Sequence, residues 1–410
     1  MQIKKKQMAG DFLLNLAASF LSIGVLQILL YPFLAQYLAA EQYGIVLTII
    51  GVGNTITNSF GGSLNNVRLL QNTAYEAKDL QGDFVPLFAA FCVLAAASYG
   101  AYLAAGSTEP PVTILLLVLF VAAATMRRYA CVAFRVVINY KKNFILNAVV
   151  GVAQVAGIVI LYFGGRQALW PLPFFLGEAA GVVYLLAAST IFREPLCRTP
   201  LLRQTCKKTF VLFFTTLIAS LILYLDRLLL LPILGGEAVS VYTVAAFFGK
   251  SLGVLVTPLA AVLLSYYAQK DFGMTLRGYW KINMSMIAFS AMFYLFCALV
   301  GPFGTGVFYP TLIEAARPYI RMANLAAVVN VTSNMVQPAV LRYAPTRWQL
   351  IIEGLYGGFY LVAGCLSASR YGLQGFCLSA VAAAVVKLTV LLVAGHWGVQ
   401  YSGRDPKYGN

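Results

Sequence analysis

The chain has 410 residues, of which 60% are hydrophobic and only 10% are charged. Charged residues make up about 25% of an average soluble domain, so this composition excludes a soluble enzyme, a disordered chain and a coiled coil. The few charges are mostly positive, with 29 Lys and Arg against 14 Asp and Glu and a net charge of +15. In such an apolar chain this excess indicates loops on the cytoplasmic side of a membrane rather than nucleic-acid binding.

Apolar stretches follow one another along the whole chain, with short polar interruptions between them. A membrane-spanning helix needs about 20 mostly apolar residues. Twelve stretches meet this requirement, so we expect an all-α polytopic membrane protein with 12 transmembrane helices. Their approximate limits are 12–38, 43–65, 84–105, 111–135, 143–163, 170–192, 209–232, 239–268, 281–301, 311–340, 346–368 and 374–398.

The basic residues alternate between the predicted loops. With the N-terminus in the cytoplasm, nearly all loop Lys and Arg residues fall on the cytoplasmic side, and only Arg166 and Arg370 fall outside. This asymmetry predicts a plasma-membrane protein with both termini in the cytoplasm. The seven cysteines include no CxxC pair, so we expect neither a disulfide framework nor a metal site.

Two similar turns indicate an internal repeat. Leu38-Ala-Ala-Glu41 separates the first two spans, and Leu234-Gly-Gly-Glu237 separates the seventh and eighth. Each turn lies near the start of a set of six spans. We therefore expect two parallel six-helix bundles, residues 1–200 (helices 1–6) and 201–410 (helices 7–12), with a substrate cavity between them.

Charged residues within the predicted spans are functional candidates, because a charge in the bilayer is costly. Lys250 and Lys387 fall near the middle of spans 8 and 12, and no acid in the helix of Lys250 is placed to pair with it. Asp226 and Arg227 are adjacent, so they point about 100° apart and should face different helices. The other candidates are Glu178, Arg317, Arg321 and Glu353. Glu178 and Lys250 have a structural alternative, an ion pair within a packing motif, and Arg317 and Arg321 have another, an interfacial position.

Polar residues near the cytoplasmic side add to this set. Asn54, Asn58 and Asn65 share one face of span 2, which indicates a wet interior, although amides also join helices to one another. Arg128 and Arg135 share a face at the inner end of span 4. These arginines belong either to the general excess of basic residues in cytoplasmic loops or to a site that captures a lipid headgroup at the cytoplasmic entrance of the cavity.

Three stretches resemble the polysaccharide flippases: AAEQYG at residues 39–44, LDRLLL at 225–230 with LGGEAVSVYTVA at 234–245, and FYPTLIEAARPYIR at 308–321. These flippases move undecaprenyl-pyrophosphate-linked oligosaccharides across the bacterial inner membrane. They share a superfamily, the multidrug/oligosaccharidyl-lipid/polysaccharide (MOP) exporters, with the lipid II flippases. The resemblance implies this fold, a role in O-antigen, capsule or exopolysaccharide synthesis, a monomer, and polysaccharide polymerase and glycosyltransferases as partners.

Basic residues outnumber acidic ones within the spans, so we expect an electropositive cavity that binds a diphosphate. The candidate substrate-binding residues are Arg321, Lys250, Lys387, Arg227, Arg317, Arg128, Asn54 and Asn58. No GxxxxGK[ST] motif occurs, so we expect no nucleotide cofactor and energy from an H⁺ or Na⁺ gradient or from substrate supply. The candidate ion-coupling residues are Asp226, Glu353 and Glu178.

Two other functions compete with this one. The first is an ion-coupled multidrug or metabolite exporter of the same fold, which a cavity dominated by acidic residues would favour. A membrane-embedded polysaccharide polymerase or ligase would need catalytic residues on a sizeable outer loop, and the predicted outer loops are short. The chain has one histidine, His396 near the inner end of span 12, which does not suit an enzyme site. We therefore expect a transporter and not an enzyme.

Overall fold

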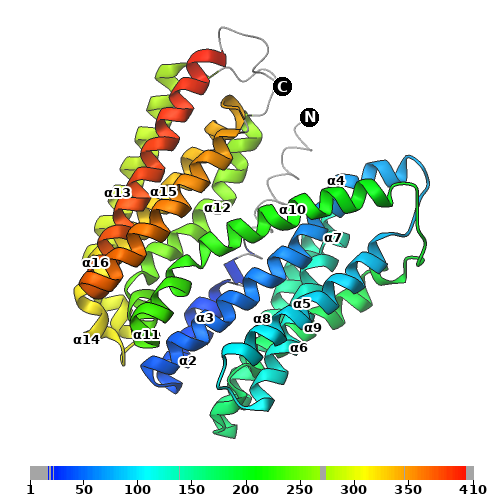
Figure 1. Cartoon of the computed structure of the whole chain (residues 1–410), viewed down its shortest axis with the longest axis horizontal. Helices are drawn as coiled ribbons and strands as arrows, with labels where there is room; N and C mark the ends of the chain where they lie inside the picture. The colour runs from blue at the N-terminus through cyan, green and yellow to red at the C-terminus, as the bar shows by residue number, and fades with distance from the viewer. Residues whose placement is uncertain are drawn as a thin grey trace. The chain divides into compact units, whose positions relative to one another are not determined.

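The computed structural model describes residues 17, 20–21, 23–137, 139–267, 274–345 and 347–402. Helices and short connections make up these residues, and no strand occurs among them (Figure 1). The predicted all-α class is therefore confirmed. The basic start at Lys4 to Lys6 and most of the first half of span 1 lie outside the described residues.

The chain divides into two compact units, one of Met1–Leu38 and Thr48–Tyr224, the other of Ala39–Leu47 and Leu225–Asn410. The first contains η1 (Val25–Leu30), α2 (Tyr31–Tyr37), the later part of α3 (Ala40–Thr57), η2 (Asn58–Gly62), α4 (Ser63–Glu76), α5 (Phe84–Gly106), α6 (Pro111–Ala130), α7 (Val132–Val136), α8 (Tyr140–Gly164), η3 (Gln167–Leu169), α9 (Leu172–Ala188), η4 (Ile191–Arg193) and α10 (Leu202–Leu223). The second contains the start of α3, α11 (Leu225–Ala245), α12 (Phe247–Tyr267), α13 (Leu276–Phe308), α14 (Ile313–Ala316), η5 (Arg317–Tyr319), α15 (Ile320–Tyr343) and α16 (Arg347–Ser402).

These units differ in detail from the two predicted bundles. Helix α10, which the sequence predicts at the start of the second bundle, packs against α4 and η2 in the first unit. The first residues of α3 belong instead to the second unit. The assignment of helices 1–6 and 7–12 to two repeated bundles stays a prediction.

The chain is a multi-pass membrane protein. Eight helical segments of the described residues are long and apolar enough to cross a bilayer, and Val25–Tyr37 is a shorter apolar helix. Helix α16 covers the predicted spans 11 and 12 and is interrupted at Gly372, and α11 joins the end of span 7 to the start of span 8 across Gly235. Because α11 and α16 each join two helices across a kink at a glycine, the count of twelve crossings stays a prediction.

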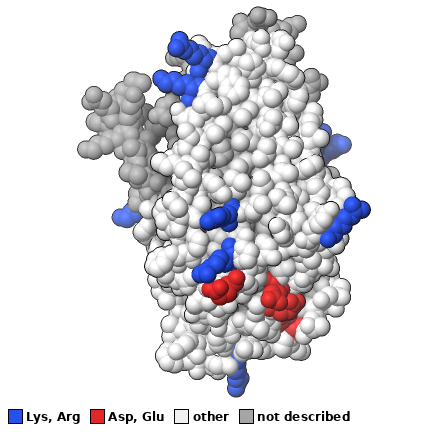
Figure 2. Space-filling view, turned by 90° about the vertical axis from the view of Figure 1, so that its left-hand side faces the viewer, with Lys and Arg blue, Asp and Glu red and all other residues white. Residues whose placement is uncertain are grey.

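Each unit exposes apolar side chains along its helices. In the first unit Phe163 of α8 is 81% exposed, and in the second unit Leu299 of α13 is 79% exposed. Figure 2 shows that charged side chains are few on the face that includes α13 and α16. Water would not stabilise such large apolar surfaces, whereas lipid chains do.

The two longest polar interruptions of the sequence pack against each other in the first unit. The buried carboxylate of Asp83 accepts hydrogen bonds from the Tyr75 hydroxyl, at 2.7 Å, and from the Thr199 backbone N–H, at 2.8 Å. Burial raises the pKa of Tyr75, so this hydroxyl remains a donor at neutral pH. Arg68 adds a salt bridge, donating from Nη1 to Glu194 Oε2 at 2.8 Å. These bonds order a region that hydropathy alone would leave as loop.

The two repeat turns, residues 39–44 and 234–240, contact each other within the second unit. Glu41 accepts the backbone N–H groups of Gly236 and Glu237, both at 2.8 Å, and the Ser240 hydroxyl donates to the Ala40 carbonyl. The break that Glu41 covers needs a glycine at position 235, where φ is +83°. A side chain at Gly44 is excluded, since its Cβ would lie 1.8 Å from the Gly236 carbonyl oxygen.

Candidate functional site

The charged residues of the predicted spans form separate groups in the two units. In the first unit Arg127 of α6 and Glu178 of α9 form a two-pronged ion pair, through Nε and through Nη2, the latter 2.8 Å from Oε1. The glycines that flank Glu178 let Arg127 and Gln154 pack closely against α9. A Cβ at Gly181 would lie 2.5 Å from Arg127 Cδ, and one at Gly177 would lie 2.5 Å from the side chain of Gln154. The contacts thus match the structural alternative for Glu178.

Arg128 lies next to this pair but is bound differently. Its Nη2 donates to Asn54 Oδ1 at 3.0 Å and its Nη1 to Asn58 Oδ1. Its Nε is buried and has no hydrogen-bond partner among the described residues. Neutral amides therefore accept these side-chain hydrogen bonds, and the nearby Glu178 carboxylate bonds to Arg127 instead.

The local backbone brings Asn58 to Arg128. Asn58 begins the π-helical turn η2, which lies between α3 and α4, and π-turns recur at functional sites. Gly61 in that turn permits close approach of α6, because a Cβ there would lie 2.6 Å from the Thr125 carbonyl oxygen. Asn54 and Asn58, predicted to bind substrate, thus hold an arginine. Asn65, on the same predicted stripe, bonds to the Arg128 and Tyr129 carbonyls and to Arg135.

In the second unit Asp226 and Arg227 begin α11 and face different helices, as predicted. The buried Asp226 carboxylate pairs with Lys250 of α12, and its Oδ1 accepts the Arg227 backbone N–H at 2.9 Å. Arg227 Nη1 donates to the Leu47 carbonyl of α3 at 3.0 Å. Lys250 therefore has an acidic partner on another helix, although its own helix offers none. Its side chain keeps 36% exposure, whereas that of Asp226 keeps 7%.

A second lysine pair lies within α16. Lys387 Nζ is 3.4 Å from Glu353 Oε1 and 4.7 Å from the centre of the Tyr356 ring. Lys250 Nζ similarly lies 5.3 Å from the centre of the Tyr242 ring. Successive ring contacts of 5.1, 5.7 and 5.8 Å join Tyr242, Phe376, Tyr360 and Tyr356. The two lysine–carboxylate pairs thus lie at the ends of one buried row of aromatic rings.

Arg317 and Arg321 are not part of these groups. The long helix α15 begins at Ile320, later than predicted, so Arg317 lies in the short 3₁₀ turn η5 before it. Arg317 is exposed and lies 3.5 Å from the exposed Glu314, and Arg321 is exposed in the first turn of α15. These positions match the interfacial alternative.

The sequence predicts the charged residues within the spans but not the residues with which they pair. The pairing of Arg127, at the inner end of span 4, with Glu178 is not predicted, although an acid within span 6 signals that a base must lie opposite it. No sequence pattern marks Tyr242 and Tyr356 as site residues, because aromatic residues are common throughout the chain. The pairing of Asp226 with Lys250 depends on the helix break at Gly235 and on tertiary packing, which hydropathy does not report.

The contact between Arg127 and Glu178 gives a direct prediction. Glu178→Gln should lower the free energy of unfolding by about 1–3 kcal/mol, because it leaves the Arg127 guanidinium without a charged partner in an apolar surrounding. Glu237→Gln is the matched control, since Glu237 is exposed. Thermal unfolding of both variants in detergent measures the difference. Equal stability of the two variants would show that the pair contributes nothing.

No protein-family model and no curated protein matches this sequence. Solved structures do match. Lipid II flippase MurJ in an inward closed conformation has a TM-score of 0.67 at 12% identity, over 93% of this chain and 87% of that one. An inward-facing multidrug resistance MATE transporter of the MOP superfamily has a TM-score of 0.58 at 13% identity, over 98% and 96%. The Vibrio cholerae MATE transporter VcmN in the bent form has a TM-score of 0.60 at 14% identity, over 97% and 98%.

The chain has the fold of the MOP superfamily. The MOP fold predicted from the three motif stretches is thereby confirmed across nearly the whole chain. The solved proteins that share it here are a lipid II flippase and multidrug transporters. At identities of this size the likeness establishes the MOP fold, and the cargo has to be argued from the residues.

Proposed function

We propose that this protein flips an undecaprenyl-pyrophosphate-linked oligosaccharide from the cytoplasmic to the outer leaflet by alternating access, for synthesis of a surface polysaccharide. The observation that carries the proposal is Arg128, a cation whose Nε is buried and whose side-chain partners are neutral amides. A charge held in this way, without an opposite charge in contact, favours an anionic ligand, and a diphosphate matches the fork of a guanidinium.

The lysine pairs fit the same cargo. Lys250 is partly exposed while Asp226 is buried, so an arriving diphosphate reaches the ammonium group first. Binding there would give the ammonium a new acidic partner and would leave the Asp226 carboxylate without its own, unless a proton neutralises it. We assign diphosphate binding to Arg128, Lys250, Arg227 and Lys387, with Arg317 and Arg321 at the interface. The polyprenyl tail would stay in lipid while the headgroup crosses.

Ion coupling follows from the same pairs. Protonation of Asp226 would break its ion pair with Lys250, and protonation of Glu353 would break its ion pair with Lys387. In each case the lysine would become available to the diphosphate. H⁺ is therefore the coupling ion that this arrangement suits best. Glu178 is held on both oxygens by Arg127 and is the weakest of the three candidates.

The setting we propose is the bacterial inner membrane, with both termini in the cytoplasm. The excess of basic residues in the loops that the sequence predicts on that side supports it. In this setting the glycosyltransferases that build the lipid-linked unit supply the substrate, and a polysaccharide polymerase consumes it on the outer side.

A multidrug exporter is the second candidate. The MATE structures that share the fold favour it, as does the presence of four carboxylates within the predicted spans. Deletion of the gene separates the two functions. Lipid-linked oligosaccharide trapped on the cytoplasmic leaflet supports the flippase, whereas normal surface glycan with increased drug sensitivity supports the exporter.

Arg128→Gln provides the residue-level test. Glutamine keeps a polar amide beside Asn54 and Asn58 but removes the charge, so we expect transport to fall about 10- to 100-fold while the protein stays folded. Arg198→Gln, at an exposed loop position, is the matched control and should transport normally. Appearance of surface glycan in a complemented deletion strain is the readout. Full activity of Arg128→Gln would overturn the assignment of this arginine.

A further inference from the structure

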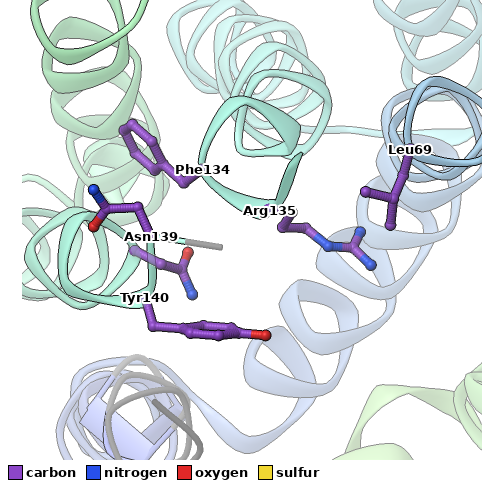
Figure 3. Close-up of a pocket in the computed structure, with 6 residues that line it drawn as sticks. Leu69, Phe134, Arg135, Asn139 and Tyr140 are labelled. Atoms are coloured by element: carbon purple, nitrogen blue, oxygen red, sulfur yellow. The ribbon is translucent and has the colours of Figure 1, made fainter. Parts of the chain in front are cut away.

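A polar cavity lies in the first unit, beside α4 and the short helix α7. Its volume is about 270 Å³, and its walls come from α4, α7 and the start of α8. Figure 3 shows the side chains of Arg135 and Tyr140 extending into the same open space. The residues that line it are Leu69, Phe134, Arg135, Asn139, Tyr140 and Asn143.

Local structure fixes the polar groups of this cavity. The chain turns at Cys131 between α6 and α7, which places Arg135 on a helix separate from Arg128. Asn139 caps α8 by accepting the Lys142 backbone N–H at 3.1 Å. Phe134 is buried and forms an apolar wall. The cavity is therefore built by short helices with defined ends rather than by a free loop.

Arg135 has donors to spare. Its Nη1 donates to Asn65 Oδ1 and, at 3.3 Å, to Asn66 Oδ1. Across the described part of the chain no hydrogen bond from its Nε or Nη2 is found, and no carboxylate pairs with it. Lys142 adds a second positive charge, with Nζ 5.7 Å from the centre of the Phe134 ring. The surroundings of the cavity are thus cationic.

We propose that this cavity binds a single phosphate group, presented by an anionic lipid headgroup or as free phosphate. Arg135 would supply the charge through Nε and Nη2, and the Tyr140 hydroxyl and the Asn143 amide are polar groups of the same cavity. A volume of 270 Å³ equals that of about nine waters, which accommodates a phosphate with a small substituent but not an oligosaccharide. The site is therefore separate from the proposed cargo site and does not depend on it.

The position agrees with a lipid source. Arg135 of α7 and Lys142 of α8 lie in a part of the chain that the charge distribution assigns to the cytoplasmic side, where anionic headgroups attract basic residues. A headgroup held here would tie α7 and the start of α8 to the membrane surface. Free phosphate would satisfy the same chemistry without that tie.

The test measures binding to the purified full-length protein. Dihexanoyl phosphatidic acid and inorganic phosphate are titrated separately, with the thermal unfolding midpoint in detergent as the readout. A rise in midpoint with the lipid alone identifies a lipid headgroup, and a rise with both identifies a general phosphate site. Arg135→Gln should weaken the binding of whichever ligand raises the midpoint by about tenfold or more, because it removes the charge-assisted bonds.

Two further variants separate the site from general electrostatics. Leu69→Trp fills the cavity while keeping every charge, so it should also abolish the rise in midpoint. Arg203→Gln removes an exposed charge elsewhere, in the first turn of α10, and should leave the rise unchanged. The proposal is overturned if neither ligand raises the midpoint of the wild type, if Leu69→Trp binds normally, or if Arg203→Gln weakens binding as much as Arg135→Gln.

Discussion

Asp226→Asn should destabilise the protein by about 2–4 kcal/mol and abolish transport. The substitution removes the carboxylate with which Lys250 forms its ion pair, and which lies beside Arg227. A buried cation without a partner destabilises the folded state more than a paired one. The lower part of this range applies because Lys250 keeps 36% exposure and water screens it partly. Thermal unfolding in detergent and surface-glycan complementation measure the two effects.

The double variant Asp226→Asn with Lys250→Met is its control. Removing both charges should recover stability to within about 1 kcal/mol of the wild type, because methionine keeps the length of lysine without its charge. Transport should stay lost if Lys250 binds the diphosphate. A double variant as unstable as Asp226→Asn alone would contradict the ion pair, and a fully active one would contradict the role of Lys250.

Gly44→Ala should be the most destabilising single-methyl addition in the two repeat turns. The new Cβ would lie 1.8 Å from the Gly236 carbonyl oxygen, so the turns must separate and Glu41 must release the Gly236 and Glu237 N–H groups. We expect a loss of about 3 kcal/mol or more.

Gly354→Ala is the matched control, since nothing lies within 4 Å of a Cβ at that helical position of α16. Alanine favours a helix over glycine, so this variant should be neutral or slightly stabilised. Unfolding midpoints of the two variants in detergent give the comparison. If Gly44→Ala unfolds like Gly354→Ala, the contact between the turns does not form in the protein.

Much of the fold follows from the sequence because hydropathy and charge asymmetry act over whole segments. Every predicted span coincides at least in part with a helical segment of the described residues, and the fold indicated by the motif stretches is confirmed. The repeated turns are visible as a sequence similarity, and the structure adds that they are each other's contact partners. One departure from the prediction has a local cause. The residues around Pro318 form a 3₁₀ turn, so α15 begins several residues later than the predicted span.

The candidate site is predictable only in part. A charge within an apolar stretch is visible in the sequence, and so is the divergence of Asp226 from Arg227, because helix geometry fixes it. The partner of each charge depends on which helices pack together, as for Lys250 and Glu178, and hydropathy holds no such information. Asn54 and Asn58 show the limit most clearly, since a stripe that suits sugars equally suits an arginine.

The spacing of the ion pairs along the chain bears on how the protein enters its membrane. Asp226 with Lys250, and Glu353 with Lys387, each join neighbouring helical segments, so a hairpin leaving the translocon carries both charges together. Arg127 and Glu178 are separated by the whole of α8, so the arginine is synthesised well before its partner. We expect α6 to wait with Arg127 at the membrane interface until α9 follows, which makes the insertion of three helices a single cooperative step.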